Sequence, residues 1–299
     1  AQDGSYGVAQ DSSLTGTLKG GDPDGDPLTF TIVANPSKGK VTLNNSATGA
    51  FTYSPDAGVT GNDAFTFRVS DGKLTSPTAT VAIAVTSREP RVTEGLQALY
   101  TFDEGAGATV FDVSGVGKPL DLTVADTSRV RWVEGGLAVT GSTLIASPGA
   151  ASKIIDAARA AGGITIEAWV KPADTGQNGP ARLVTLSRDL NRRNFTLGQG
   201  VHGGSSSLYD VRLRTTATDL NGVPSVSSPA GSLSTQLTHV VYTRNREGAA
   251  RLYIDGAQKA AGTVGGTFSN WDTACRLALG NELAGGRPWL GEYHLVAVY

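Results

Sequence analysis

Residues 164–172 read ITIEAWVKP, and they decide the fold of the larger part of the chain. Ile164, Ile166, Ala168 and Val170 alternate with the more polar set Thr165, Glu167, Trp169 and Lys171. Successive side chains of a β-strand point to opposite faces, so this alternation predicts a strand that lays one face on a core.

The same two-residue rhythm recurs from about Gly95 to the end of the chain. It predicts strands at Ala98–Phe102, Val211–Leu213, His239–Arg244, Arg251–Ile254, Leu277–Leu279 and Tyr293–Tyr299. Asp255-Gly256 is a strong hairpin signal, because both residues tolerate a positive φ. The one helical pattern spans Ala151–Ala161. About 200 residues of strands with one short helix favour a double-sheet jelly roll.

The first part of the chain, to about Thr86, carries shorter alternating stretches separated by turn formers. The alternating apolar residues are Leu28, Phe30 and Ile32, then Val41 and Leu43, Phe51 and Tyr53, Phe65, Phe67 and Val69, and finally Val81, Ile83 and Val85. Asn35-Pro36 and Asp71-Gly72 lie between such stretches, and these residue types fit the φ angles of turns. About seven short strands in under ~90 residues indicate an immunoglobulin-like sandwich.

A polar junction, Ser87–Glu94, separates the two parts. Pro90 stops strand pairing, and the charged residues around it keep the segment solvated. The predicted domains are therefore residues 1–90 and residues 91–299, both of them all-β. The last segment, His294–Tyr299, is a strand without a turn or polar tail after it. We expect the chain to be part of a longer protein or assembly, cut at its C-terminal end.

The composition narrows the classes of function. A formal net charge of −2 over 299 residues gives no basic face, so no nucleic-acid partner is expected. No apolar run reaches the roughly 18–20 residues that span a bilayer. The single cysteine, Cys275, is expected to be a buried strand residue. The start of the chain lacks the regions of a signal peptide, and we expect a removed signal and an extracellular, cell-surface or periplasmic location.

Four segments of the first part carry a family resemblance. They are Asp11–Leu18, Asp22–Phe30, Gly49–Pro55 and Gly61–Gly72, and together they cover most of that part. They resemble the cadherin-like and immunoglobulin-like repeats found in tandem in large bacterial surface adhesins. The resemblance implies a spacer domain in a secreted adhesion protein.

The second part carries a resemblance to another family. The matching segments are Leu99–Gly105, Phe111–Gly115, Ile164–Pro172, Arg251–Gly256 and Trp289–Tyr293. They resemble a laminin-G-like, concanavalin-A-like lectin domain, which implies that this part binds a glycan or a protein. His294–Tyr299 departs from the acidic closing strand of many family members, and this puts a ligand role there in doubt.

Two groups of acidic residues are candidate Ca²⁺ sites. Asp22, Asp24 and Asp26 occupy alternate positions around Gly25 and could converge on one hard cation, with carbonyls or water completing the shell. The alternative is a solvated Asp-Gly turn. Asp103 and Asp112 form the second candidate, on turns near the opening strand, and the resemblance suggests calcium at such an edge. The alternative there is a capped turn with exposed acids.

A polar, glycine-rich loop suggests a ligand platform. Its candidate residues are Asn281, Glu282, Arg287 and Trp289, with Asn191 and Arg193 on a second loop and Trp271 as a further aromatic. Sugars are bound by aromatic faces together with hydrogen bonds from Asn, Glu and Arg. The alternative for each tryptophan is a core residue, and this is our interpretation of Trp169 on its alternating strand. Arg287 could equally pair with an acid such as Glu292.

Catalysis finds little support in the sequence. Glu167 stands alone on its strand, without the paired carboxylates of a retaining glycosidase. His202, His239 and His294 lack the spacing of a zinc site. The sequence therefore predicts a non-catalytic recognition or adhesion module that binds a glycan or a protein, with the first part as a calcium-stiffened spacer. One alternative is an accessory subunit that docks protein partners, and another is a carbohydrate-active enzyme.

Overall fold

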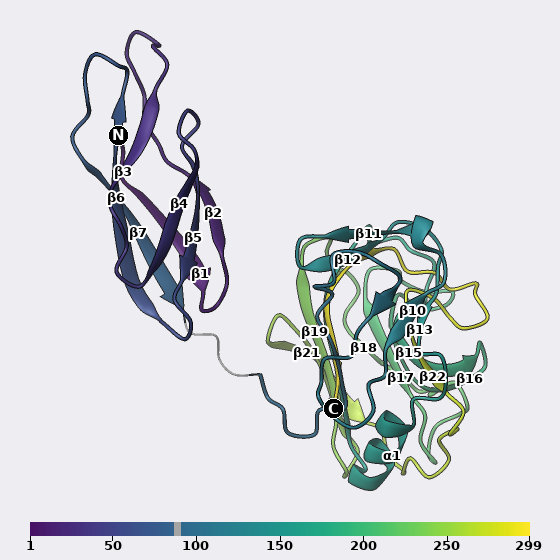
Figure 1. Ribbon diagram of the computed structural model, residues 1–299. Helices are drawn as coiled ribbons and strands as arrows, with labels where there is room; N and C mark the ends of the chain where they lie inside the picture. Colours follow the sequence, from purple (N-terminus) through teal and green to yellow (C-terminus); the bar gives the residue numbers. More distant parts are fainter. Residues whose placement is uncertain (87–90) are drawn as a thin grey trace. The chain divides into compact units, whose positions relative to one another are not determined.

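The structure, a computed structural model, describes residues 1–86 and 91–299. The chain divides into two compact units, Ala1–Arg91 and Val92–Tyr299 (Figure 1). Each unit is a sandwich of β-sheets, which confirms the predicted all-β fold. The predicted boundary at residue 90 lies outside the described residues. No helix in the described ranges is long and apolar enough to cross a membrane.

The first unit is a two-sheet sandwich of seven strands. They are β1 (Gly4–Ala9), β2 (Leu14–Thr17), β3 (Thr29–Ala34), β4 (Gly39–Asn45), β5 (Ala50–Pro55), β6 (Gly61–Ser70) and β7 (Ala79–Thr86). One sheet has the order β1-β7-β6-β3 and the other β2-β5-β4. Along β7, buried and exposed residues alternate without a break, and Val81, Ile83 and Val85 face the core. The strand periodicity of the sequence thus builds this core directly.

The second unit packs two larger sheets against each other. The β14 sheet has the order β11 (Val130–Val133), β12 (Gly136–Val139), β23 (Gly291–Val298), β14 (Ile164–Pro172), β19 (Thr238–Arg244), β20 (Ala249–Ile254) and β21 (Ala257–Thr263), with β8 (Ala98–Tyr100) also paired to β23. The β15 sheet has the order β18 (Val226–Ser227), β17 (Tyr209–Leu213), β16 (Arg192–Gln199), β15 (Ala181–Asp189), β22 (Arg276–Leu279), β13 (Ile145–Ala146), β10 (Leu122–Val124) and β9 (Thr109–Val110).

The core of the second unit lies between these two sheets. Ile164, Ile166, Ala168 and Val170 of β14 are all buried in it. Tyr293 of β23 ties the sheets together, because its hydroxyl donates to the carbonyl of Leu183 at 2.7 Å. Burial raises the pKa of Tyr293 far above its ordinary value, so the hydroxyl remains a donor.

Several local predictions are confirmed. β20 and β21 pair across Asp255-Gly256, where φ is 50° and 76°. The helix α1 (Ser152–Ala161) ends at Gly162, whose φ of 69° allows its N–H to bond the carbonyl of Ala158. A short 3-10 turn, η1 (Thr127–Arg129), precedes β11. Cys275 is buried as expected, but it precedes β22, so its predicted place in a strand is wrong; burial raises the pKa of its thiol to about 12.

Candidate binding surface

Residues 280–290 join β22 to β23 and hold four of the predicted ligand residues. Asn281 is 4% exposed and organises this loop from within. Its Oδ1 accepts the N–H groups of Glu282 and Arg287 at 2.9 and 3.0 Å, and its Nδ2 donates to Ser142. The side chain of Asn281 is therefore occupied in shaping the loop, with little surface left for a ligand.

Two of the predicted platform tryptophans lie inside the protein. Trp289 has no exposed surface, and its indole N–H donates to Gln199 Oε1 at 3.0 Å. Trp271 is 3% exposed and donates to the carbonyl of Arg214. A ring whose faces are covered by protein offers nothing on which a sugar could stack. The structure thus assigns both rings to the core, the alternative interpretation of their sequence context.

A buried polar cluster accounts for Glu282. Its Oε2 accepts Arg182 Nε at 3.0 Å in an ion pair whose side chains are 0% and 2% exposed, and Ser187 donates to its Oε1. Arg193 is also buried, and its Nη2 donates to the carbonyl of Leu190. Burial lowers the pKa of Arg193 to about 10, which still leaves it charged at neutral pH. These side chains hold β15, β16 and the 280–290 loop together.

Two predicted ligand residues retain accessible surface. Arg287 is half-buried and donates from Nη1 to the carbonyl of Gly179 at 3.2 Å. Asn191 is exposed in the turn between β15 and β16, where its N–H bonds Asp189 Oδ1. The predicted platform is therefore divided, with most of its members enclosed, and the role of Asn191 stays a prediction.

The acidic loop of the first unit forms a hydrogen-bonded turn. Asp22 Oδ1 accepts the N–H groups of Asp24 and Asp26 at 2.9 and 3.1 Å. Asp26 is paired with Lys73 at 3.1 Å. Among the described residues, no group of three or more His, Cys, Asp or Glu side chains could hold a metal ion. Calcium at this loop stays a prediction, and the geometry matches the alternative of an Asp-Gly turn.

The second acidic candidate is split between surface and interior. Asp103 is exposed, whereas the side chain of Asp112 is enclosed and forms an ion pair with Lys153. Asp112 also accepts the N–H groups of Leu120 and Ser114. Burial alone would raise the pKa of Asp112, but the Lys153 ammonium and these donors outweigh it and lower the pKa. Calcium here stays a prediction as well, with Asp112 already engaged by protein donors.

The variant Asp112→Asn tests this internal role through pH. Because the folded pKa of Asp112 is lowered, its stabilisation is complete above the unfolded value of about 4 and is lost as the pH falls. We expect the variant to be less stable than the natural chain by about 1–3 kcal/mol at pH 7. Urea unfolding at pH 7 and pH 3 should show this difference shrinking in acid. A difference that is equal at both pH values would contradict the assignment.

The outward face of β14 presents the exposed tryptophan of this unit. Trp169 is 36% exposed and shares this face with Thr165, Glu167 and Lys171. Its ring stacks on His239 of β19, with centroids 4.5 Å apart and planes inclined by 13°. The interpretation of Trp169 as a core residue is wrong. The signal was present in the sequence, because the alternation places residue 169 opposite the buried Ala168 and Val170.

Charged and polar groups flank Trp169 along the sheet. Glu167 Oε1 lies 3.0 Å from His239 Nε2, and Glu167 Oε2 accepts the hydroxyl of Tyr299 at 3.2 Å. On the other side of Trp169, Lys171 lies 3.4 Å from Glu292 of β23. Hydrogen-bonding groups therefore stand on both sides of an aromatic ring. We call the outward row Thr165, Glu167, Trp169 and Lys171, with the neighbours named here, the β14 face.

A cavity lies at each end of the β14 face. One, of about 430 Å³, is lined by Lys171, Glu292 and Arg131 among others. The other, of about 300 Å³, is lined by Thr165 and Tyr299 among others. The row between Thr165 and Lys171 spans about 20 Å at the strand rise of ~3.3 Å per residue. Hollows therefore lie at both ends of the β14 face.

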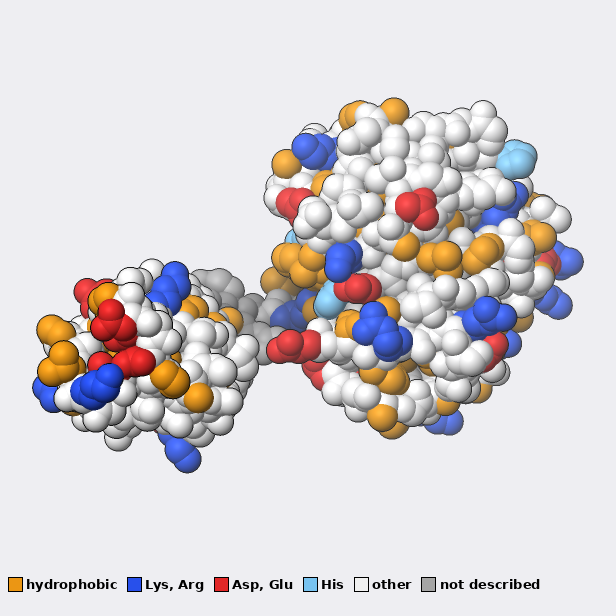
Figure 2. All heavy atoms as spheres, turned by 90° about the horizontal axis from the view of Figure 1, so that it is seen from above, with side chains coloured by type: hydrophobic (Ala, Val, Ile, Leu, Met, Phe, Trp, Pro, Cys, Tyr) orange, Lys and Arg blue, Asp and Glu red, His pale blue; other side chains and the backbone are white. Residues whose placement is uncertain are grey.

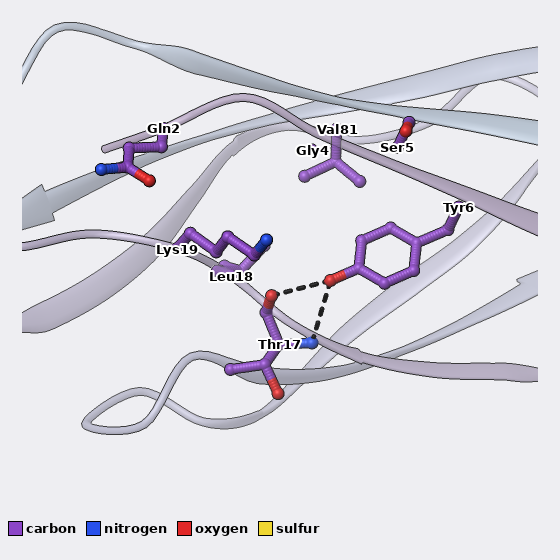
Figure 3. Close-up of a pocket in the computed structure, with 8 residues that line it drawn as sticks. All are labelled: Gln2, Gly4, Ser5, Tyr6, Thr17, Leu18, Lys19 and Val81. Atoms are coloured by element: carbon purple, nitrogen blue, oxygen red, sulfur yellow. Dashed lines mark hydrogen bonds between the residues drawn. The ribbon is translucent and has the colours of Figure 1, made fainter.

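The first unit contains a smaller pocket, shown in Figure 3. Its volume is about 110 Å³, and Tyr6 crosses it to bond the carbonyl of Thr17 at 2.8 Å. Pockets that hold small ligands usually have about 300–1,000 Å³. Figure 2 shows that charged side chains are thinly scattered over the visible surface, without a large area of one sign.

Comparison with known proteins gives matches in both units. The profile of the concanavalin A-like lectin/glucanases superfamily matches residues 147–299, just over half of the chain. The profile of a bacterial immunoglobulin domain matches residues 1–84. No curated protein matches the chain.

Solved structures resemble part of the chain at low sequence identity. Domain 4 of a GH43 extracellular arabinanase from Geobacillus stearothermophilus, solved with arabinotriose, is 18% identical and covers 68% of this chain and 91% of its own, with a TM-score of 0.44. The binding domain of botulinum neurotoxin serotype D/C is 11% identical and covers 69% of this chain, with a TM-score of 0.48. The chain spans 49% of that toxin domain. On the strength of its profile match, the chain belongs to the concanavalin A-like lectin/glucanases superfamily, and it carries a bacterial immunoglobulin domain at its N-terminal end.

Proposed function

We propose that the second unit is a non-catalytic glycan-binding module of an extracellular protein and that the β14 face is its binding surface. The observation that carries this proposal is the exposed ring of Trp169, with hydrogen-bonding groups on both sides. A sugar presents C–H groups on its ring faces and hydroxyls at its edges. The indole of Trp169 stacks on His239 and is flanked along its strand by the carboxylate of Glu167 and the ammonium of Lys171, which matches that pattern.

The spacing of carboxylates favours binding over hydrolysis. The two carboxylates of the β14 face are Glu167 and Glu292, and Glu292 lies opposite Lys171 in the strand register. Lys171 is four residues along β14 from Glu167, or about 13 Å at ~3.3 Å per residue. Glycosidases hold their two carboxylates roughly 5–10 Å apart. By this backbone estimate the strand positions of the two carboxylates lie farther apart than those distances, which supports binding over hydrolysis.

The first unit fits a spacer. Its apolar residues form one buried core, and the pocket described in it is small and lined by Tyr6, so this pocket leaves little room for a ligand. In this proposal it positions the glycan-binding unit.

Trp169→Ala tests the binding surface. We expect it to weaken glycan binding roughly 10-fold or more, as removal of a central aromatic contact does. The free energy of unfolding should change little, because the ring faces outward. A glycan array identifies the ligand, and isothermal titration calorimetry measures its affinity. Phe111→Ala is the matched control, since Phe111 is an exposed aromatic (50%) outside the β14 sheet.

The outcomes separate the alternatives. Equal affinity of the natural chain and Trp169→Ala would place the ligand elsewhere on the unit. No glycan binding, with or without EDTA, would favour an accessory subunit that docks proteins. Binding that disappears with EDTA would support the predicted calcium.

A further inference from the structure

A third hollow of the unit lies at the α1 end, next to the hollow beside Thr165, with which it shares Arg244. This cavity of about 350 Å³, which we call the arginine pocket, falls in the size range of small-ligand sites. Its lining residues are Arg159, Gly162, Arg244, Arg246, Gly266, Thr267, Phe268 and Ser269. Three arginines and no acid line it, which is unusual in a chain whose net charge is −2.

Arg244 is the buried member of the pocket, and only neutral groups hold it. Its Nε and Nη2 donate to the carbonyl of Val264 at 3.0 and 2.9 Å, and Nη2 also donates to Gly266. Its guanidinium carbon lies 4.9 Å from the centre of the Phe268 ring. Burial lowers the pKa of Arg244, but a guanidinium keeps its proton. Among the described residues no carboxylate forms an ion pair with it, although Glu247 is near enough to favour its charge.

Arg159 and Arg246 are the exposed members. Arg159, on the last turn of α1, donates from Nη2 to the carbonyl of Ser269 at 2.9 Å. Arg246 lies in the turn after β19, and its alkyl chain rests close to Gly162. Within the described ranges, its guanidinium makes no hydrogen bond or ion pair. The hydroxyls of Thr267 and Ser269 lie 3.0 Å apart beside them.

Two acids lie near this pocket without lining it. Glu247 follows Arg246 and Asp156 lies one turn before Arg159, but neither lines the cavity. The partial negative charge at the C-terminal end of α1 explains why Arg159 is favourable there. In the described part of the chain, the C-terminal end of α1 forms no hydrogen bond with the guanidinium of Arg246. The five N–H donors of that guanidinium, arranged in a planar fork, are therefore available to a ligand. Such a fork matches the oxygens of a carboxylate or a sulfate.

We infer that the arginine pocket binds the anionic group of an acidic glycan, either a uronate carboxylate or a sulfate ester. This inference rests on the proposed glycan-binding function and adds the class of sugar. The lining suits a sugar because the hydroxyls of Thr267 and Ser269 stand beside the cations. An isolated pocket on a weakly acidic chain does not provide the basic stripe that nucleic acid requires.

Calorimetry with three matched hexasaccharides tests the inference on the full chain. The probes are a galacturonic acid hexamer, a sulfated galactan hexamer and a neutral galactan hexamer. We expect at least one acidic probe to bind more tightly than the neutral one. Arg246→Gln and Arg159→Gln should each lower the affinity for that acidic probe roughly 10-fold. The affinity for the neutral probe should stay unchanged. The preferred acidic probe then identifies the anion as carboxylate or sulfate.

The matched control is Lys259→Gln, which removes one positive charge from exposed β21 away from the pocket. Its affinity for the acidic probes should equal that of the natural chain. The inference is overturned if the acidic probes bind no better than the neutral one, or if Lys259→Gln weakens them as much as the arginine variants. Arg246→Lys keeps the positive charge but removes the forked guanidinium. Its affinity for the acidic probes should lie between those of the natural chain and Arg246→Gln, which separates a specific contact from a general effect of charge.

Failure of this inference is distinguishable from failure of the proposed function. Neutral binding that depends on Trp169, with no preference for the acidic probes, would leave the β14 face as the binding surface and remove the arginine pocket. Circular dichroism of each variant checks its fold.

Discussion

Replacing Trp289 by alanine is expected to lower the free energy of unfolding of the second unit by about 3–5 kcal/mol. The side chain is fully buried, and its ring lies 4.8 Å from that of Tyr293. Its removal would leave a cavity between the sheets and would leave Gln199 Oε1 without its donor. Urea unfolding followed by far-ultraviolet circular dichroism measures the difference, and Trp169→Ala serves as the exposed comparison with an expected change below about 1 kcal/mol.

The contrast between the two tryptophans is the informative result. Trp289→Phe should recover part of the lost stability, because it refills much of the volume without restoring the hydrogen bond. A Trp289→Ala protein that is as stable as the natural chain but has lost glycan affinity would refute the assignment of this ring to the core. It would also restore the ligand role that the sequence suggested.

Glu282→Gln is expected to destabilise the second unit by about 3–5 kcal/mol, because it leaves the buried charge of Arg182 without its partner. The ion pair is 3.0 Å long, and both side chains are enclosed. Arg212 and Arg287 add to the cost, since each lies near enough to Arg182 to disfavour its charge. Urea unfolding at pH 7 gives the free energy.

A double-variant cycle separates the pair from its surroundings. Adding Arg182→Met to Glu282→Gln should return part of the stability, because the unpaired charge is then absent. Arg192→Gln is the control, since its pair with Asp189 is half-exposed and worth about 0–1 kcal/mol. If Glu282→Gln lowered the free energy of unfolding no more than Arg192→Gln does, the buried ion pair would contribute no more to stability than an exposed one.

The fold was predictable because it depends on alternation that is local in sequence. The buried rows of β7 and β14 and the Asp255-Gly256 turn all follow from side-chain period and φ preference, without knowledge of distant partners. The sheet order was not accessible in this way. Strand β15, for example, pairs with β22, some ninety residues later, and only the folded chain reveals that neighbour.

The candidate site was harder to predict, for a physical reason. Polar and aromatic residues in a glycine-rich loop are compatible both with a ligand platform and with an internal network. The sequence does not show that Arg182 donates a hydrogen bond to Glu282, or that Gln199 accepts one from the indole of Trp289. For Trp169 the information was present, because its strand alternates cleanly. The arginine pocket joins residues from α1, the turn after β19 and the segment after β21, and sequence spacing does not indicate such a junction.

The enclosed thiol of Cys275 has a practical consequence for every variant described above. Its sulfur is shielded from solvent and strongly disfavours ionisation, so it is chemically silent toward alkylating reagents while the domain stays closed. The chain has no other cysteine. A single fluorophore can therefore be attached to a cysteine engineered at any surface position without competing labelling. The rate at which the natural thiol is modified then reports the rate of global unfolding.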